Sequence, residues 1–213
     1  MNKQTVITIG REFGSGGREI GERLARDLGI PFYDKELIAL AAEKSGMSQE
    51  YLKEADEKPT NSLLYSLSTG FSLLGRAASP AYSMPITDKL FILQSDLIKQ
   101  AAEQGSCVIV GRCADYILSD HPSCVHIFLR AELPLRIVRC MKLYDLTKEK
   151  AEELITKTDK KRASYYNYYS GNKWGDLKNY HLCIDTGAVG IENTVRLIES
   201  FLEMKAANEA AKG

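Results

Sequence analysis

The hydrophobic positions along the chain alternate between short β-rich runs and longer stripes with helical spacing. Thr5–Ile9 is a run of Thr, Val and Ile, and apolar residues at helical spacing follow it from Arg18 until Gly29, a residue type that ends helices. Further strands are predicted at 31–34, 107–110, 125–129 and 182–185, and further helices at 35–44, 88–104, near Pro134, at 147–169 and at 191–204. This alternation is typical of an α/β fold with parallel strands, about five of them here.

The segment between Lys58 and Asp88 interrupts this alternation. Its only charged residue in between is Arg76, and it is rich in Ser, Leu, Gly and Ala. Because it is too apolar for a solvated linker, we predict an inserted helical region that covers a substrate or forms a subunit interface. The helix predicted after it has an apolar face made of Phe91, Ile92, Leu97, Ile98 and Ala101.

Length and composition limit the class of protein. A chain of 213 residues can form one compact domain, and the Ala-rich tail 205–213 is expected to fray. The balance of 28 basic and 28 acidic residues argues against a general nucleic-acid coat protein. No apolar run reaches the length of about 18 residues that a membrane span needs, so we expect a cytoplasmic protein with no membrane partner.

Cysteine and histidine give no indication of a metal centre. The five cysteines include no C-x-x-C pair, and the three histidines are scattered. This usage is typical of reduced, structural cysteines. No metal-ligating residue is therefore predicted.

A glycine-rich turn, Gly10–Gly17, joins the first predicted strand to the first predicted helix. Glycines allow successive backbone N–H groups to converge on an anion, and the helix N-terminus adds its positive dipole. A tight turn that only satisfies backbone geometry is the alternative. The phosphate-binding residues that we predict are Arg11, Phe13, Gly14, Ser15, Gly16, Gly17 and Arg18.

The turn departs from the P-loop motif G-x-x-x-x-G-K-[ST], in which the lysine binds the outer phosphates and the hydroxyl binds magnesium. With Gly14–Gly16 at the end of the loop, Gly17 stands at the lysine position, Arg18 at the hydroxyl position and Arg11 at the first glycine. Either arginine could supply the missing charge. The Rossmann pattern is a weaker match, because Glu19 stands where its third glycine is expected.

The ordered motifs resemble the cytidylate kinase-like branch of the nucleoside monophosphate kinases. The strand, loop and helix of 5–28 begin the match, and the region 50–90 matches least. Where the family has Gly-Arg-Asp, this chain has Gly111-Arg112-Cys113. The other matching segments are 31–38, 108–112, 128–131, 136–139, 159–162 and 182–186.

The resemblance implies a single P-loop domain over 1–213, with a three-layer α/β/α fold. A helical acceptor-binding insert at about 35–90 and a lid at about 140–176 are expected in it. The implied activity is ATP-dependent phosphoryl transfer, with Mg²⁺, to a nucleoside monophosphate such as CMP or dCMP. The implied partners are nucleotide substrates, and no nucleic-acid partner is expected. A homodimer is possible in such a kinase.

The resemblance also implies site residues. Asp34 and Arg112 are expected to bind the acceptor. The arginines expected to act in catalysis are Arg18, Arg112, Arg136, Arg139 and Arg162. Phosphoryl transfer needs such charges because it depends on positioning and charge neutralisation.

Each of these assignments has an alternative. The arginines could form surface ion pairs, Asp34 could cap a helix, and Tyr165–Tyr169 beside Trp174 could stack on a base or pack the lid. The unusual segment 58–88 leaves open a kinase for another small acceptor. The absent lysine leaves open a nucleotide sensor without catalysis.

Overall fold

The computed structural model describes residues 4–34, 46 and 85–211. The predicted helix at 35–44 and nearly all of the predicted insert at 35–90 lie outside the described residues.

Five parallel strands form the sheet at the centre of the molecule. They are β1 (Val6–Arg11), β2 (Phe32–Tyr33), β3 (Cys107–Val110), β4 (Cys124–Arg130) and β5 (Leu182–Asp185), in the order β2-β3-β1-β4-β5. Every strand pair is parallel, with Ile7 opposite Val108 of β3 and Val125 of β4. The predicted α/β class is therefore confirmed.

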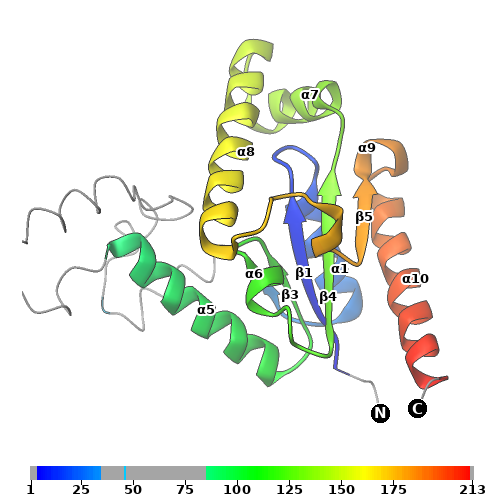
Figure 1. Ribbon diagram of the computed structural model, residues 1–213. Coiled ribbons are helices and arrows are strands. Elements are labelled where there is room, and N and C mark those ends of the chain that lie inside the picture. The colour runs from blue at the N-terminus through cyan, green and yellow to red at the C-terminus, as the bar shows by residue number, and fades with distance from the viewer. Residues whose placement is uncertain (1–3, 35–45, 47–84, 212–213) are drawn as a thin grey trace, which may run out of the picture.

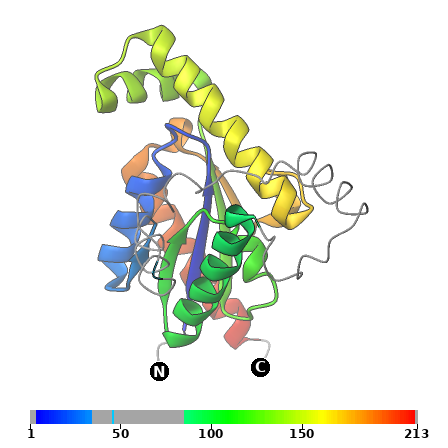
Figure 2. The same cartoon turned by 90° about the vertical axis from the view of Figure 1, so that its left-hand side faces the viewer.

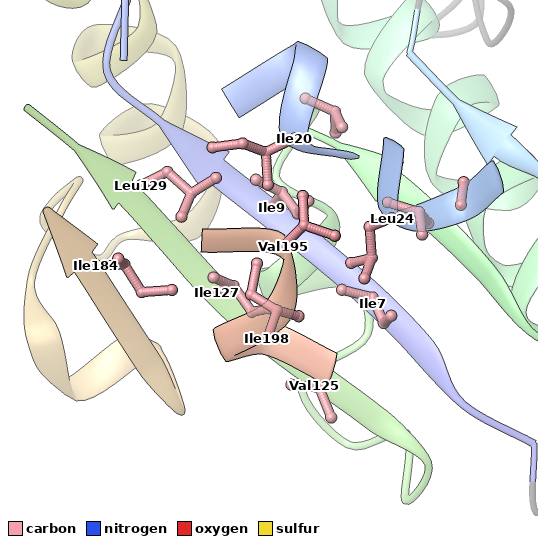
Figure 3. Close-up of a cluster of buried hydrophobic side chains, with 13 residues drawn as sticks. Ile7, Ile9, Ile20, Leu24, Val125, Ile127, Leu129, Ile184, Val195 and Ile198 are labelled. Carbon is pink, nitrogen blue, oxygen red and sulfur yellow. The ribbon is translucent and has the colours of Figure 1, made fainter. Parts of the chain in front are cut away.

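Helices cover both faces of this sheet. Helices α1 (Gly17–Leu28) and α10 (Ile191–Ala210) lie on one face, where Ile20, Leu24 and Ile198 meet the side chains of the central strands (Figure 3). Helices α5 (Ile86–Gln104) and α6 (Ala114–Ile117) cover the other face (Figure 1). Alternate strand residues supply the two cores, because successive side chains of a strand point to opposite faces.

Two helices extend beyond the carboxyl ends of the strands. Helix α7 (Leu133–Tyr144) and the first half of α8 (Lys148–Ser170) project from the sheet, and the second half of α8 returns beside it (Figures 1 and 2). Thr147 caps α8 by accepting a hydrogen bond from the backbone N–H of Lys150, as its sequence predicts. A small core that includes Ile137 and Ile155 joins the two helices. These helices occupy most of the region predicted as a lid.

Short helices complete the described fold. A 3₁₀ helix, η3 (Leu177–Asn179), precedes β5, and α9 (Thr186–Val189) directly follows it. In the part of the chain that the structure describes, no helix is long and apolar enough to cross a membrane.

One expectation about a helix was wrong. Ile92, predicted on the apolar face of α5, is 48% exposed, and Leu90 is buried instead. Leu90 lies on the same face of the helix as Leu97 and Ile98, with which it packs in one core.

The last helix extends beyond its predicted end at residue 204. It continues as far as Ala210, and Lys205 forms an ion pair with Glu209 one turn later. Fraying of the tail 205–213 stays a prediction.

Candidate functional site

A pocket lies at the carboxyl ends of β1 and β3, the two strands at which the chain changes direction across the sheet. It is lined by Gly10 and Arg11 of β1, by Gly111 and Arg112 after β3, and by Arg162 of α8. Chain connections leave β1 toward β2 and leave β3 toward β4, so this edge is the switch point where open α/β sheets bind ligands. Three of the predicted phosphate-binding or catalytic arginines therefore meet at one pocket.

The glycine-rich loop beside this pocket has a fixed backbone. Gly16 caps α1 in the left-handed conformation, with a φ of 85°, and a Cβ there would overlap Ile191 of α10. The buried Ser15 donates from its hydroxyl to the carbonyl oxygen of Glu12 at 2.9 Å, and its own carbonyl accepts from Thr186 Oγ1 at 2.6 Å. Because the loop is held on both sides, its backbone would need little further ordering to bind an anion.

Residues of α7 and α8 hold the same loop from the outside. Arg136 forms an ion pair with Asp159 and donates to the carbonyl oxygen of Phe13 at 3.3 Å. Asp159 in turn accepts a hydrogen bond of 2.7 Å from the backbone N–H of Phe13. Arg162 donates to the carbonyl oxygen of Arg11 at 3.2 Å, and its guanidinium carbon lies 5.4 Å from the centre of the Phe13 ring.

Arg139 lies one helical turn after Arg136 and reaches the start of α1. It pairs with Glu19, and its guanidinium carbon lies 3.4 Å from where a Cβ of Gly16 would be. The two arginines share one face of α7, as their spacing predicts. Both therefore face the loop, although each also has a carboxylate partner.

Asp34, just after β2, binds arginine side chains. It is 4% exposed, and it accepts from Nε of Arg18 at 2.9 Å, while Nη2 of Arg11 lies 3.9 Å from its other oxygen. Arg18 is 51% exposed and also lies 3.5 Å from Glu22. The helix that Asp34 was predicted to cap lies outside the described residues.

Arg112 has an unusual backbone conformation. Its φ is 58° and that of Cys113 is 55°, so two successive non-glycine residues are in the left-handed region, which costs about 1 kcal/mol or more for each. Arg112 is buried and lines the pocket. Strained conformations of this kind cluster at functional sites.

The structure adds residues to the site that the sequence did not identify as a group. Asp115 of α6 accepts a hydrogen bond of 2.6 Å from the hydroxyl of Tyr166, and Tyr180 and Trp174 lie on the same pocket. Burial raises the pKa of Asp115, although the hydrogen bond from Tyr166 opposes this shift. Burial also raises the pKa of Tyr166 and that of Tyr180. The clustering of tyrosines near Trp174 was a signal for part of this group, but nothing in the sequence marked Tyr180.

The other two tyrosines of the 165–169 cluster do not line the pocket. Tyr169 nevertheless packs against Tyr165, with ring centroids 4.8 Å apart. Tyr169 stacks on Phe91 of α5, with ring centroids 4.0 Å apart, and donates to Asp88. Tyr168 is 45% exposed. Of the aromatic cluster, Tyr165, Tyr166 and Trp174 therefore line the pocket.

The described residues contain neither a disulfide nor a cluster of metal-ligating side chains. None of the five cysteines forms a disulfide, and four of them are buried. Over residues 4–34 and 85–211, no three His, Cys, Asp or Glu side chains gather as a metal-binding group.

Comparison with known proteins relates the chain to kinases. Residues 6–188 match the family model described as the cytidylate kinase-like family. A protein named cytidylate kinase from Methanopyrus kandleri is 24% identical over 208 residues, which are 93% of each chain.

Solved structures with the same fold cover nearly the whole chain. A crystal structure of a protein from Eubacterium ventriosum has a TM-score of 0.69 and 29% identity over 94% of this chain and 99% of its own. Shikimate kinase from Bacteroides thetaiotaomicron has a TM-score of 0.55 and 16% identity over the same shares. The three-layer α/β/α fold of the P-loop kinases, expected from the sequence, is thereby confirmed.

Proposed function

The chain belongs to the cytidylate kinase-like family, and we propose that it is an ATP-dependent kinase for a nucleoside monophosphate of the CMP or dCMP type. The family and the fold are those of kinases that act on nucleotides or small molecules. The observation that carries the proposal is the convergence of Arg11, Arg112 and Arg162 on one pocket beside the glycine-rich loop. Three cations are suited to the charge that accumulates when one phosphate attacks another.

The donor nucleotide would place its phosphates on the loop. The N–H groups of the loop and the N-terminus of α1 attract the phosphates, as in other glycine-rich strand–helix turns. Arg139, whose guanidinium lies beside Gly16, would add a further positive charge near the loop. Arg162 would lie close to the transferred group, because it touches both the loop and the pocket.

The acceptor would lie in the pocket itself. Arg112 would bind its phosphate, while Tyr165, Tyr166 and Trp174 supply aromatic surface for a base. Asp115, held by Tyr166, would accept a hydrogen bond from an amino or hydroxyl group of the acceptor. An oxygen of the acceptor phosphate then attacks the γ-phosphorus of ATP, the bond from that phosphorus to the bridging oxygen breaks, and ADP leaves.

Magnesium would neutralise the phosphates of ATP, but the loop provides poor protein ligands for it. Position 18 is an arginine where the P-loop motif has a hydroxyl, the hydroxyl of Ser15 is bonded to Glu12, and Asp34 already binds arginine. Magnesium in kinases is held largely by the substrate phosphates. No step of the proposal therefore depends on a protein ligand to the metal.

A coupled assay of ADP release with CMP, dCMP, UMP, AMP and GMP tests this function. We expect turnover with at least one pyrimidine monophosphate. A folded sample that binds ATP and phosphorylates none of the five would contradict the proposal.

The acceptor pocket can be tested separately. Tyr166→Phe removes the hydroxyl that holds Asp115, so the KM for the acceptor should rise about tenfold while the KM for ATP stays unchanged. Tyr168→Phe is the matched control, because Tyr168 is exposed on the same helix. Equal effects of the two substitutions would remove Asp115 and Tyr166 from the acceptor site.

A kinase for another small acceptor is the second candidate. The buried carboxylate of Asp115 favours it, because a carboxylate in the pocket suits an acceptor rich in hydroxyl groups as well as a base. Adding shikimate and gluconate to the assay distinguishes the two. A sensor without catalysis would instead bind ATP and release no ADP with any acceptor.

A further inference from the structure

Arg11 and Gly17, at opposite ends of the glycine-rich loop, are in direct contact. A Cβ added at Gly17 would lie 2.6 Å from Cβ of Arg11 and 2.9 Å from its Cγ. Atoms of two side chains cannot approach so closely, so only one of these two positions can carry a side chain in this backbone. The glycine at position 17 therefore makes room for Arg11.

A second glycine makes room for the other end of the same side chain. A Cβ added at Gly111, just after β3, would overlap Nη1 of Arg11 and lie 2.9 Å from its Cζ. The φ of Gly111 is 79°, a conformation that favours glycine. Gly17 and Gly111 thus direct Arg11 from the loop across the carboxyl end of the sheet, where its guanidinium reaches the pocket shared with Arg112 and Arg162.

The two contacting positions are those of the first glycine and the lysine in the motif G-x-x-x-x-G-K. In this chain the cation stands at the first position and the glycine at the last. We propose that this is a reciprocal exchange, in which Arg11 supplies the phosphate-binding charge of the absent lysine through the space left at Gly17. The inference rests on the proposed function for the reaction that this charge serves, but the phosphate contact itself does not need an acceptor.

The surroundings of Arg18 make it a weaker candidate for this charge. Arg18 is 51% exposed and lies beside Glu22. Its Nε donates to Asp34 at 2.9 Å, whereas Nη2 of Arg11 lies 3.9 Å from the same carboxylate. The guanidinium carbon of Arg18 lies 5.9 Å from the ring centre of Phe32. The side chain of Arg11 is 11% exposed and lines the pocket. A charge removed from water interacts more strongly with a bound phosphate than one on the surface.

A double-mutant cycle on the full chain tests the exchange. The affinity for ATP and for inorganic tripolyphosphate is measured by calorimetry for the wild type, R11G, G17K and the double variant. R11G should weaken binding at least about tenfold, the loss expected for one charge-assisted hydrogen bond. G17K should also weaken binding, because the added side chain displaces Arg11. The double variant should recover most of the loss, since it restores the usual glycine and lysine.

A double variant that binds no better than the worse single variant would overturn the exchange. If R11G lowers the melting temperature, R11K and R11M test the role of Arg11 instead. The affinity of R11K for ATP should stay within about threefold of the wild type, and that of R11M should be about tenfold weaker. R18M should lose less than R11M, and the reverse order would also overturn the inference. R26M is the control, because Arg26 lies on α1 with Arg18 and its side chain is 71% exposed.

The readouts separate this inference from the proposed function. A wild type that binds ATP but phosphorylates no acceptor would refute the nucleoside monophosphate kinase, and the binding cycle would still decide the role of Arg11. A wild type that binds neither ATP nor tripolyphosphate would refute both.

Discussion

At the scale of single residues, Arg162 connects the helix α8 to both the loop and the pocket. It donates to the carbonyl oxygen of Arg11 and lies over the ring of Phe13. In the proposed reaction Arg162 lies beside the transferred phosphoryl group, so Arg162→Met should lower kcat about 100-fold or more by removing that cation. Steady-state kinetics with the best acceptor of the assay panel measures this loss.

Arg130→Met is the matched control for that change. Arg130 is 56% exposed and pairs with Asp185 at 3.0 Å, so its loss should change kcat by less than about twofold. Melting temperatures of both variants exclude unfolding as the cause. If Arg162→Met kept the kcat of the wild type, Arg162 would only hold the loop through the carbonyl of Arg11 and the ring of Phe13, without a role in the reaction.

At the scale of elements, the joint between α7 and α8 contains a conformational cost that can be removed. Asp145 caps α7 with a φ of 51°, and its side chain is exposed. Asp145→Gly should raise the free energy of unfolding by about 0.5–1 kcal/mol, because glycine adopts this conformation without a Cβ penalty. Asp145→Ala should instead lower it by a similar amount.

Urea unfolding of the two variants measures the predicted rise and the predicted fall in the free energy of unfolding. If both substitutions shifted the midpoint in the same direction, the loss of the carboxylate, and not the backbone conformation, would explain the effect. The kcat of Asp145→Gly also shows whether the turn must adapt during turnover, because glycine loosens the joint that carries Arg136 and Arg162.

The elements themselves followed from local pattern, and the contacts between them did not. Hydrophobic periodicity and end signals such as Gly29 and Thr147 predicted most helices and strands, because these signals act within one turn or strand. The contact between Arg11 and Gly17 depends on the path of the loop, and that of Arg11 with Gly111 depends on the pairing of β1 with β3. No local pattern records such distances.

The same limit applies to the site. The catalytic arginines were predicted from the family resemblance, and their roles stay predictions. Arg11 and Arg112 lie on one pocket because the parallel sheet brings the carboxyl ends of β1 and β3 to the same edge. That Arg136 binds Asp159, and that Tyr180 joins Tyr166 and Asp115, depends on how α8 returns beside the sheet. The spacing of residues in the sequence does not predict that the second half of α8 lies beside the sheet.

At the scale of the whole molecule, the buried His126 of β4, which contacts His181 just before β5, makes stability depend on pH. His126 of β4 shares a hydrogen bond of 2.8 Å with Thr8 of β1, and its backbone N–H donates to Nδ1 of His181. Burial, with a smaller contribution from His181, lowers the pKa of His126 from 6.5 to about 4. Burial also lowers the pKa of His181.

A lowered histidine pKa has a definite consequence for unfolding. Above pH 6.5 His126 is neutral in both the folded and the unfolded chain, so its contribution to stability is fully present there. As the pH falls from about 6.5 toward 4, the unfolded chain binds the proton and the folded chain does not. The free energy of unfolding should therefore fall by about 2 kcal/mol from this residue between pH about 7.5 and about 5.

Urea unfolding of the wild type and His126→Gln at these two pH values isolates that contribution. Glutamine can still bond to Thr8 but does not titrate, so the variant should lose about 2 kcal/mol less than the wild type on acidification, whatever its stability at neutral pH. Titration of the other groups is common to both proteins and cancels in the difference. If both proteins lost the same free energy of unfolding on acidification, His126 would be protonated in the folded protein as readily as in the unfolded chain. The contact between His126 and His181 would then have to open while the sheet remains folded.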